Sequence, residues 1–377
     1  MKILVLGRGF QGSACTFDLV RYTDATVTIA DVSPGDLPNF LDPHASRIKM
    51  LELDVRDGDA VRAVMKEHEA TLSAIPYYFN FEMAALAVEA GVHFADLGGN
   101  TGIVRQQQTL DEKAQRQGVT VVADCGLAPG MVNILAAEGM RRLDQVESVR
   151  LYVGGLPENP EPPLNYQIAY SLEGVLDYYT TAASVLRDGK PAEVAALSEL
   201  ENVRFEELGT LEAFHTAGGL STMPWDFEGM VDTMEYKTLR YPGHAEAMRV
   251  IRDVGLLGLE PVMVKGTEVV PREAFIATVE PVLRKPGSPD LVALKAVIRG
   301  KKAGGPDEIV FELIDRYDQE NGISAMMRTT GYSLAITGMM LVDGRIDKRG
   351  VYTAAQCTPY EEYARELGLR GVRIEEK

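Results

Sequence analysis

Short apolar runs alternate with helical patterns over roughly the first third of the chain. Apolar or β-branched residues dominate the strand-like runs. These runs are Lys2 to Leu6, Thr26 to Ala30, Arg47 to Leu53, Thr71 to Ile75, His93 to Leu97 and Val119 to Ala123. Helical patterns cover residues 14 to 19, Asp57 to His68, Phe81 to Ala90 and Thr101 to Gln117. This alternation predicts an α/β fold with a parallel sheet, helices on both of its faces and the strand order 3-2-1-4-5-6.

The pattern changes after about Arg142, where strand and helix no longer alternate regularly. Strand-like runs are Glu147 to Gly154, Thr210 to His215, Val231 to Tyr241, Pro289 to Ile298 and Glu308 to Tyr317, and helical patterns cover Ser171 to Tyr179 and Ala245 to Val254. The proline-rich stretch from Gly155 to Pro163 is too rigid for a flexible linker. We therefore predict an α+β second domain. Ser324 to Leu341 then predicts a long apolar helix, which needs a large partner surface.

The motif GRGFQG at residues 7–12 lies between the first strand and the first helix. In this place the spacing GxGxxG is typical of a dinucleotide-binding site. Gly7 permits a tight turn, Gly9 lets the backbone approach a pyrophosphate, and Gly12 lets helix and strand pack closely. The helix N-terminus, at Phe10 and Gln11, offers free N–H groups to the phosphates.

Asp31 ends the second strand and determines which dinucleotide we expect. A carboxylate here accepts hydrogen bonds from the adenosine ribose hydroxyls and repels the 2′-phosphate of NADP. The following residues, Val32, Ser33 and Pro34, include no arginine for that phosphate, so NAD is the predicted cofactor. Because ligands lie at the carboxyl ends of parallel strands, further cofactor contacts are predicted at later strand ends. These contacts are Asp54 and Val55, which flank the adenine, together with Ile75 and Leu97.

Composition excludes several classes of protein. The chain has 377 residues, enough for two or three domains, and its net charge of -17 disfavours a nucleic-acid partner. Cys15, Cys125 and Cys357 are far apart in the sequence, so neither disulfides nor a metal site are expected. No apolar run reaches membrane-spanning length, and the first strand passes into a glycine loop rather than a signal peptide. We expect a cytoplasmic protein.

Five segments of the chain carry a distinctive sequence. They are SAIPYYFN at 73–80, DCGLAPGMVNILA at 124–136, GGLPENPEPPLNY at 154–166, TLRYPGHAEAM at 238–248 and RTTGYSLAITGMML at 328–341. Together they resemble the saccharopine dehydrogenase-like family, which includes saccharopine reductases and lysine 6-dehydrogenases. The resemblance implies an NAD-binding Rossmann domain at 1–127, an α+β domain with a mixed sheet for substrate and dimerisation at 128–323, and C-terminal helices at 324–377 that pack back on the first domain.

Two positions separate the chain from the fungal saccharopine reductases of this family. Those enzymes have a sequence similar to GLDPG where this chain has GLAPG at 126–130. The aspartate that touches their substrate is therefore replaced by Ala128 in this chain. They also place basic residues after the second strand, where this chain has Asp31. Both departures make the chain similar to lysine 6-dehydrogenase. The resemblance then implies NAD-dependent oxidation of the ε-amino group of L-lysine to 2-aminoadipate 6-semialdehyde, with release of ammonia.

This reaction needs a base near the nicotinamide. Hydride leaves the lysine Cε readily only when the ε-nitrogen, whose ordinary pKa is about 10.4, has lost its proton. Asp96, Asp124 and Cys125 follow the fifth and sixth strands and are the catalytic candidates. A helix opened by Pro129 would lower the pKa of the Cys125 thiol. The alternative roles are a small buried residue for Cys125 and turn caps for the two aspartates.

Substrate contacts are expected from the second domain. Arg240, in LRYPG at 239–243, is the candidate partner of the substrate α-carboxylate, because a guanidinium binds a carboxylate through two hydrogen bonds. A salt bridge to a surface acid is the alternative role. The other substrate-binding candidates are Tyr77, Asn165, Tyr166 and His244.

Two other functions stay open from the sequence. Reduction to saccharopine or carboxynorspermidine would involve additional carboxylates, and more than one cation would have to face them. A non-catalytic NAD-binding sensor belongs to a different class, and the residues expected to bind substrate argue against it. The expected partners are a small amino acid and a second copy of the chain, since homodimers are the commonest assembly.

Overall fold

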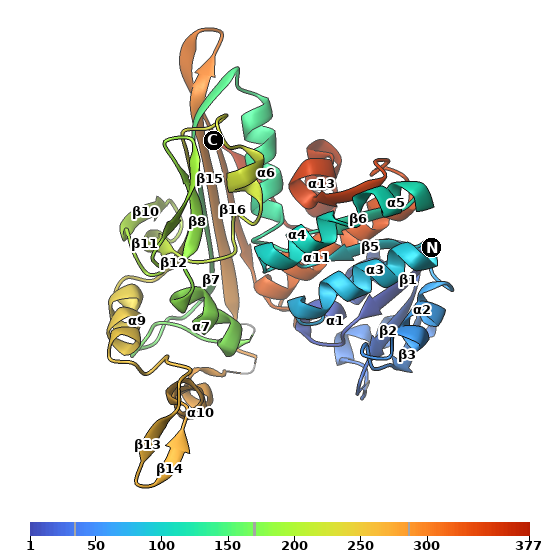
Figure 1. Cartoon of the computed structure of the whole chain (residues 1–377), viewed down its shortest axis with the longest axis horizontal. Helices are drawn as coiled ribbons and strands as arrows, with labels where there is room; N and C mark the ends of the chain where they lie inside the picture. Colours follow the sequence, from blue (N-terminus) through green and yellow to red (C-terminus); the bar gives the residue numbers. More distant parts are fainter. Residues whose placement is uncertain (34, 169–170, 286) are drawn as a thin grey trace.

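Two β-sheets lie at opposite sides of the molecule, with helices α6 (Met131–Arg141) and α11 (Ala325–Val342) between them (Figure 1). The computed structural model describes residues 1–33, 35–168, 171–285 and 287–377. In these residues the first sheet has seven parallel strands, in the order β17-β6-β5-β4-β1-β2-β3. They are β1 (Lys2–Leu6), β2 (Thr26–Asp31), β3 (Ile48–Glu52), β4 (Ala70–Ser73), β5 (His93–Asp96), β6 (Thr120–Ala123) and β17 (Gly350–Thr353). The predicted order is confirmed, and β17 extends the sheet beyond β6.

Strand β1 shows why this sheet forms as predicted. Ile3 and Val5 face a core that includes α1 (Phe10–Tyr22) and α11, whereas Leu4 and Leu6 face the opposite side. That side is covered by α2 (Gly58–Met65) and α3 (Asn80–Ala90). The four apolar residues from Ile3 to Leu6 are therefore all buried, as expected for a parallel sheet with helices on both faces. The other helices here are η1 (Asn39–Arg47), η2 (Tyr77–Phe79), α4 (Thr101–Gln108) and α5 (Asp111–Gln117).

The single helix predicted from Thr101 to Gln117 is divided into α4 and α5. The hydroxyl of Thr109 donates to the Gln106 carbonyl (2.6 Å), a local bond that competes with the helical pattern. Asp111 then starts α5, and its carboxylate accepts the N–H of Val351 (2.8 Å). This contact ties the new helix to β17, a strand more than two hundred residues away, so the sequence pattern could not predict it.

The second sheet is mixed and has nine strands within the described residues. Strand β12 pairs in parallel with β7, and the other pairings are antiparallel. The strands are β7 (Gln145–Pro157), β8 (Ala183–Arg187), β9 (Lys190–Val194), β10 (Glu201–Phe205), β11 (Gly209–His215), β12 (Thr233–Arg240), β15 (Asp290–Lys302), β16 (Gly305–Arg316) and β18 (Glu375–Glu376). Strand β7 continues into the proline-rich stretch, because the prolines begin only at its last residue.

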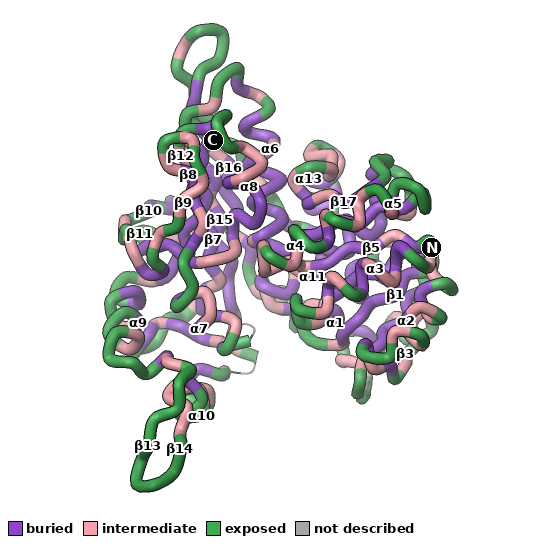
Figure 2. The backbone as a smooth tube through the Cα atoms, in the orientation of Figure 1, coloured by how far each residue is buried: buried purple, intermediate pink, exposed green. Residues whose placement is uncertain are grey.

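Short helices and one hairpin surround this sheet. The helices are α7 (Leu172–Thr180), α8 (Met223–Asp226), α9 (His244–Asp253) and α10 (Pro271–Leu283). Strands β13 (Val262–Val264) and β14 (Thr267–Val269) form a separate two-stranded hairpin. Figure 1 shows this hairpin projecting from the body of the molecule, and Figure 2 shows that it is almost entirely exposed.

Helix α11 connects the two halves of the fold. The Ser324 hydroxyl oxygen caps it by accepting the N–H of Met327 (3.1 Å), so the helix begins where the sequence predicted. The helix contacts α1, β4 and β5 on one side and β15 on the other. The chain then forms β17, α12 (Ala354–Cys357) and α13 (Tyr360–Leu369), so the C-terminal segment returns to the first sheet. A buried ion pair between Arg370 and Asp18 fixes this return.

Among the described residues, no helix combines the length and the hydropathy that crossing a bilayer requires.

The contact between α1 and α11 predicts a sensitive position at Gly331. A methyl group there would lie 2.7 Å from the Ala14 Cβ and 2.9 Å from the Gln11 carbonyl oxygen. Gly331→Ala should therefore lower the free energy of unfolding by about 1–3 kcal/mol, the usual cost of overpacking. Gly368→Ala, at a helical glycine with nothing within 4 Å, is the control, and it should be neutral or stabilise by up to about 1 kcal/mol. Urea unfolding of both variants checks this, and equal values would contradict the close approach.

Candidate active site

The glycine motif forms a tight turn between β1 and α1. Gly7 has a φ of 94°, which glycine adopts without strain. A side-chain carbon at Gly12 would overlap the Gly7 carbonyl oxygen, whereas one at Gly9 would meet nothing within 4 Å. Gly9 is also the N-cap of α1, and among the described residues no side chain caps this end. The turn thus leaves open space and free N–H groups, which fit the pyrophosphate of a dinucleotide.

Asp31 lies beside this turn at the end of β2. Its Oδ2 accepts the backbone N–H of Arg8 (2.8 Å), and its Oδ1 accepts the backbone N–H of Ser33 (3.1 Å). These two bonds hold the carboxylate against the glycine turn. This is the position that contact with an adenosine ribose requires.

The side chain of Arg8 brings a cation to the same edge of the sheet. Its Nη1 donates to the Asp36 carbonyl (2.8 Å), and the guanidinium lies beside Gly35. The prediction of NAD rests on the residues that follow β2, among which Pro34 lies outside the described residues. The arginine instead comes from within the glycine motif. A guanidinium in this place would attract a 2′-phosphate, so it weakens the argument for NAD that rests on Asp31.

Four of the other cofactor candidates lie around the glycine turn. Gln11 and Leu97 line a cavity next to the turn. Ile75 lies beside Gly7. Phe10 starts α1 and is 57% exposed, so its ring is available to a ligand at this edge.

Asp54 and Val55 lie farther out, after β3. Val55 is buried. The carboxylate of Asp54 accepts hydrogen bonds from Arg56, and these bonds lower the pKa of Asp54 to about 2. Asp54 is therefore an ionised partner of Arg56, and the structure offers its backbone rather than a free carboxylate to an adenine.

A cavity of about 230 Å³ lies where the loops after β5 and β6 meet the second sheet. The loops contribute residues 97–99 and 126–129, and α11 contributes Met326 and Thr330. Strands β7 and β12 form the opposite wall. Among the described lining residues, Arg240 is the only one with a charged side chain. The cavity therefore joins the cofactor edge of the first sheet to a single cation of the second.

The Arg240 guanidinium is held in place by several contacts at the end of β12. The residue is 5% exposed. Its Nε donates to the Tyr179 hydroxyl (3.1 Å), and its Nη1 donates to the Leu239 carbonyl (2.8 Å). Its central carbon lies 5.0 Å from the centre of the Tyr166 ring, a cation–π distance. A desolvated, fixed guanidinium of this kind is suited to an anionic group of a ligand.

His244 lies behind Arg240 rather than in the cavity, so the structure does not bring it to the substrate. Its Nδ1 lies 3.0 Å from the Leu164 carbonyl, which can only accept, so Nδ1 donates. Its Nε2 then accepts from the Tyr179 hydroxyl (3.0 Å). Burial, with the Arg240 charge as the second cause, lowers the pKa of His244 to about 3. A neutral histidine thus orients Tyr179, and Tyr179 orients Arg240.

The three remaining substrate candidates lie in different places. Tyr166 lines the cavity, and its buried hydroxyl has no hydrogen-bond partner within the described residues. Tyr77 lines an open cleft next to the cavity and is 40% exposed. Asn165 has a φ of 48° and is absent from the described lining of both spaces. Tyr166 is therefore the one best placed for a substrate.

Asp96, the last residue of β5, shapes the loop that lines the cavity. One of its oxygens accepts the N–H of Gly98 (2.7 Å), and the other accepts the Gln107 side-chain amide (2.6 Å). Burial raises the pKa of Asp96 to about 6, even though both bonds favour the charged form. With both oxygens occupied by protein donors, this carboxylate holds the turn.

Asp124 has a different environment. It follows β6, has a φ of 62° and is 2% exposed. Its carboxylate lies against Gly98, where a side-chain carbon would overlap Oδ1. The Ser221 hydroxyl and the Gly99 amide are close enough to favour the charged form, but within the described residues neither makes a well-formed hydrogen bond to it. Burial outweighs both groups and raises the pKa of Asp124 to about 7, so this carboxyl titrates near neutrality.

The lowered thiol pKa expected for Cys125 is wrong. Its side chain is fully buried, and its sulfur donates to the Val122 carbonyl (3.3 Å). Burial raises the pKa of this thiol well above its ordinary value, with the Asp96 charge as the second cause. Helix α6 begins only at Met131 and does not offset the burial. Cys125 is a small core residue, the alternative role considered from the sequence.

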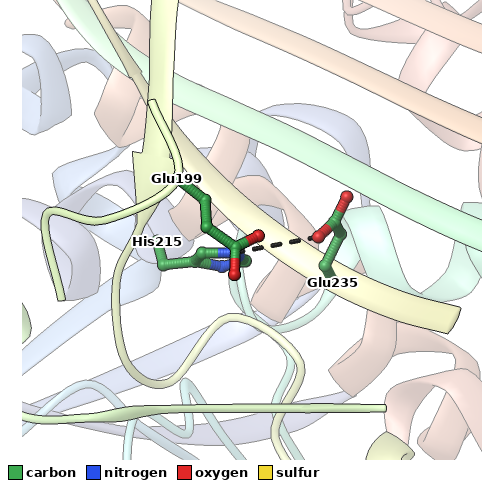
Figure 3. Close-up of side chains that lie close together, drawn as sticks. All are labelled: Glu199, His215 and Glu235. Carbon is green, nitrogen blue, oxygen red and sulfur yellow. Dashed lines mark hydrogen bonds and ion pairs between the residues drawn. The ribbon is translucent and has the colours of Figure 1, made fainter. Parts of the chain in front are cut away.

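One group of side chains away from the cavity has the spacing of metal ligands. Figure 3 shows Glu199, His215 and Glu235 around a common point in the second sheet. The Arg187 guanidinium donates to both carboxylates, at 2.9 Å and 2.7 Å. The positive charge of Arg187 thus offsets the negative charge of these acids. The Lys237 ammonium lies nearby and donates to the Glu199 carbonyl oxygen.

The parallel sheet, the glycine turn and the cavity at its carboxyl edge together define a dinucleotide-binding α/β protein. Two family models match the chain. Residues 3–122 match the saccharopine dehydrogenase NADP binding domain, and residues 126–372 match the saccharopine dehydrogenase C-terminal domain. The chain belongs to the saccharopine dehydrogenase family, as its sequence resemblance indicated.

Relatives and solved structures agree with this assignment. The L-glutamate-forming, NADP(+) saccharopine dehydrogenase of Pyricularia oryzae is 27% identical over 69% of this chain, and the chain spans only 58% of that relative. The carboxynorspermidine synthase of Vibrio alginolyticus is 21% identical over 95% of this chain and 93% of its own length. The apo saccharopine dehydrogenase of Saccharomyces cerevisiae has the same fold, with a TM-score of 0.81, 21% identity and coverage of 100% and 99% of the two chains.

The Asp31 carboxylate predicts a measurable cofactor preference. Asp31→Ala removes two hydroxyl contacts and a charge that repels a 2′-phosphate, so it should weaken NAD binding and relax discrimination against NADP. Arg8→Ala is the matched variant, and it should weaken NADP binding more than NAD binding. Calorimetric titration of both dinucleotides checks this. A wild-type protein that binds NADP more tightly than NAD would show that Arg8, rather than Asp31, controls the choice.

Proposed function

We propose that this protein catalyses the NAD-dependent oxidation of the ε-amino group of L-lysine to 2-aminoadipate 6-semialdehyde, with release of ammonia. The observation that carries the proposal is the cavity between the two sheets. It has one buried cation, Arg240, on one wall and a buried carboxyl, Asp124, behind the opposite loop. This pair of charges suits a substrate with one carboxylate and one ammonium group.

The number of cations in the cavity supports lysine over larger substrates. Saccharopine carries additional carboxylates, and each would need a positive partner in a desolvated site. Among the described lining residues Arg240 is the only cation. Ala128, which also lines the cavity, stands where the fungal reductases have an aspartate and contributes no charge.

Asp124 is the best placed of the three catalytic candidates to act as the base. Both oxygens of Asp96 already accept protein hydrogen bonds, and the Cys125 thiol stays protonated. Asp124 has no well-formed hydrogen bond among the described residues, and a pKa of about 7 leaves it ionised at alkaline pH. It could then take a proton from the substrate ammonium. Arg240 holds the carboxylate meanwhile, and Tyr166 offers a hydroxyl to the substrate.

The glycine turn, Asp31, Gln11 and Leu97 would hold the dinucleotide. When bound, it supplies the acceptor for the hydride that leaves the lysine Cε. Helix α11 contributes Met326 and Thr330 to the wall of this cavity.

A saccharopine dehydrogenase is the second candidate function. The names of several relatives favour it, and so does the arginine at the glycine turn.

Turnover assays separate the two candidates. NADH should appear when the protein is mixed with NAD and L-lysine at alkaline pH, and ammonia should appear in equal amount. The absorbance of NADH and an enzymatic ammonia assay measure both products. No turnover of lysine, with rapid NADH oxidation in the presence of 2-aminoadipate 6-semialdehyde and glutamate, would establish the saccharopine reaction instead.

Arg240 provides a test of the substrate orientation. Arg240→Lys keeps the charge but loses the planar geometry and the bond to Tyr179, so lysine turnover should be impaired by roughly 1.5–3 kcal/mol in kcat/KM. The same change should matter far less for cadaverine, which has no carboxylate. Dinucleotide binding should be unchanged, because the residue belongs to the second sheet. If kcat/KM for lysine is unchanged in a folded variant, Arg240 has only a structural role.

A further inference from the structure

We propose that Tyr178 restricts this protein to primary amines, because its ring separates the cavity from the neighbouring cleft at the place where the substrate nitrogen would lie. The inference rests on the proposed function, since it takes Arg240 as the partner of the lysine carboxylate. A primary amine ends at its nitrogen and needs only the cavity. A secondary amine carries a further group on that nitrogen, and this group would have to pass Tyr178 to enter the cleft.

The cleft is the larger of two neighbouring spaces. Its volume is about 930 Å³, whereas the cavity has about 230 Å³. The walls of the cleft come from the loops after β4 and β5, from α7 and from residues 216–221. Gly99, Tyr178 and Tyr236 line both spaces, so they belong to the boundary between them. A group too large for the cavity would find room in the cleft if this boundary were open.

The Tyr178 ring is packed between two glycines at this boundary. A side-chain carbon at Gly218 would lie 3.3 Å from the ring atom Cε1 and 3.6 Å from the Gly99 carbonyl oxygen. A side-chain carbon at Gly99 would lie 3.4 Å from the Tyr178 hydroxyl oxygen. The ring therefore reaches from α7 of the second half, past Gly218, to the loop after β5 of the first half.

The neighbouring residue Tyr179 fixes the part of α7 that carries this ring. Its hydroxyl accepts from the Arg240 Nε (3.1 Å) and donates to the His244 Nε2 (3.0 Å). Because Tyr178 and Tyr179 are consecutive, the contacts that hold the Arg240 guanidinium also hold the boundary. A substrate whose carboxylate is bound by Arg240 would therefore meet the Tyr178 ring at a fixed distance along its chain.

The Tyr178 hydroxyl lies at the loop that would receive the substrate nitrogen. Gly98 and Gly99 line the cavity, and the Asp124 carboxylate lies against Gly98. With its carboxylate on Arg240, lysine would direct its ε-nitrogen toward this loop, as the proposed base requires. A substituent on the nitrogen would then collide with the Tyr178 ring. Burial raises the pKa of Tyr178 to about 12, so the boundary carries no charge of this residue at the pH of the assay.

The charge of the cleft determines which substituent it could accept. Its lining includes Glu173, Asp177 and Glu193, and no described lining residue is basic. A neutral or cationic substituent is compatible with these acids, whereas a carboxylate would lose water without gaining a positive partner. Saccharopine carries its additional carboxylates on the group attached to the nitrogen. The ring of Tyr178 and the charge of the cleft therefore both disfavour saccharopine.

Oxidation of a secondary amine breaks the same bonds as oxidation of lysine. From R–CH2–NH–R′, one hydride leaves Cε for NAD, the oxidant of the proposed function, and the iminium ion R–CH=NHR′+ remains. One water molecule adds to this carbon, the C–N bond breaks, and the products are the aldehyde R–CHO and the ammonium ion R′–NH3+. The only difference from lysine is that an alkylamine is released in place of ammonia.

The test compares the wild-type protein with Tyr178→Phe, Tyr178→Leu and Tyr178→Ala. NADH absorbance gives kcat/KM for L-lysine and for Nε-isopropyl-L-lysine, and the wild type should strongly prefer lysine. The ratio of kcat/KM for the isopropyl derivative to that for lysine should rise at least about tenfold in Tyr178→Ala, the lower end of what one methylene group supplies. It should rise less in Tyr178→Leu, which also serves if the alanine variant does not fold. It should not change in Tyr178→Phe, which keeps the ring.

Tyr78→Ala is the matched control. Tyr78 is 60% exposed and lines the cleft, and it is absent from the described lining of the cavity. The same replacement there enlarges the cleft but leaves the boundary in place, so the ratio should keep its wild-type value. Saccharopine should gain less than Nε-isopropyl-L-lysine in Tyr178→Ala, because its carboxylates still meet the acids of the cleft.

A binding measurement needs no turnover. Calorimetric titration without dinucleotide should show that Nε-isopropyl-L-lysine binds at least about tenfold more tightly to Tyr178→Ala than to the wild type, with little change for lysine. Unchanged ratios of kcat/KM and of affinity in folded leucine and alanine variants would overturn the proposal. So would a wild-type protein that accepts both amines equally well. Failure of the wild type to oxidise either amine would contradict the proposed function instead, and the ratio of affinities would then decide the role of Tyr178.

Discussion

Helix α11 is buried between β4 and β5 of the first sheet and β15 of the second, and the position of the site depends on this packing. The close approach is possible because the helix has glycines where it meets its neighbours. Gly331 lies against Ala14, and Gly338 lies against Leu72. The same helix places Met326 and Thr330 in the wall of the cavity. The helix that joins the two halves of the molecule therefore also forms part of the wall of the space in which a substrate would be held.

The protonation state and the position of the charged groups at that space depend on neighbouring groups that would not touch a ligand. His244 is neutral because it is buried beside Arg240, and it fixes the Tyr179 hydroxyl that holds the guanidinium. Asp124 has a raised pKa because it is buried with few donors. The Arg240 guanidinium has several protein contacts, which suit it to binding an anionic group. The Asp124 carboxylate has no well-formed hydrogen bond to any residue that the structure describes, which suits it to proton transfer.

Local patterns in the sequence predicted the first sheet, the glycine turn and the start of α11. Each of these depends on residues close together in the chain or on regular spacing. The role of His244 could not be predicted in this way, because its contacts with Leu164 and Tyr179 bridge long distances in the sequence. Arg8 was overlooked because a side chain from the glycine motif reaches past the end of β2. Tyr178 gave no signal at all, since a tyrosine in a helical pattern is ordinary until the fold places its ring between the cavity and the cleft.

A crystal structure of the protein with a bound dinucleotide and L-lysine would test the central claim most directly. That claim is that one substrate carboxylate meets Arg240 while the ε-nitrogen faces Asp124 across the Gly98–Gly99 loop. The account predicts a carboxylate oxygen within hydrogen-bond distance of the Arg240 guanidinium and the ε-nitrogen on the Gly98 side of the cavity. A lysine bound in the open cleft, or one whose carboxylate lies away from Arg240, would contradict it.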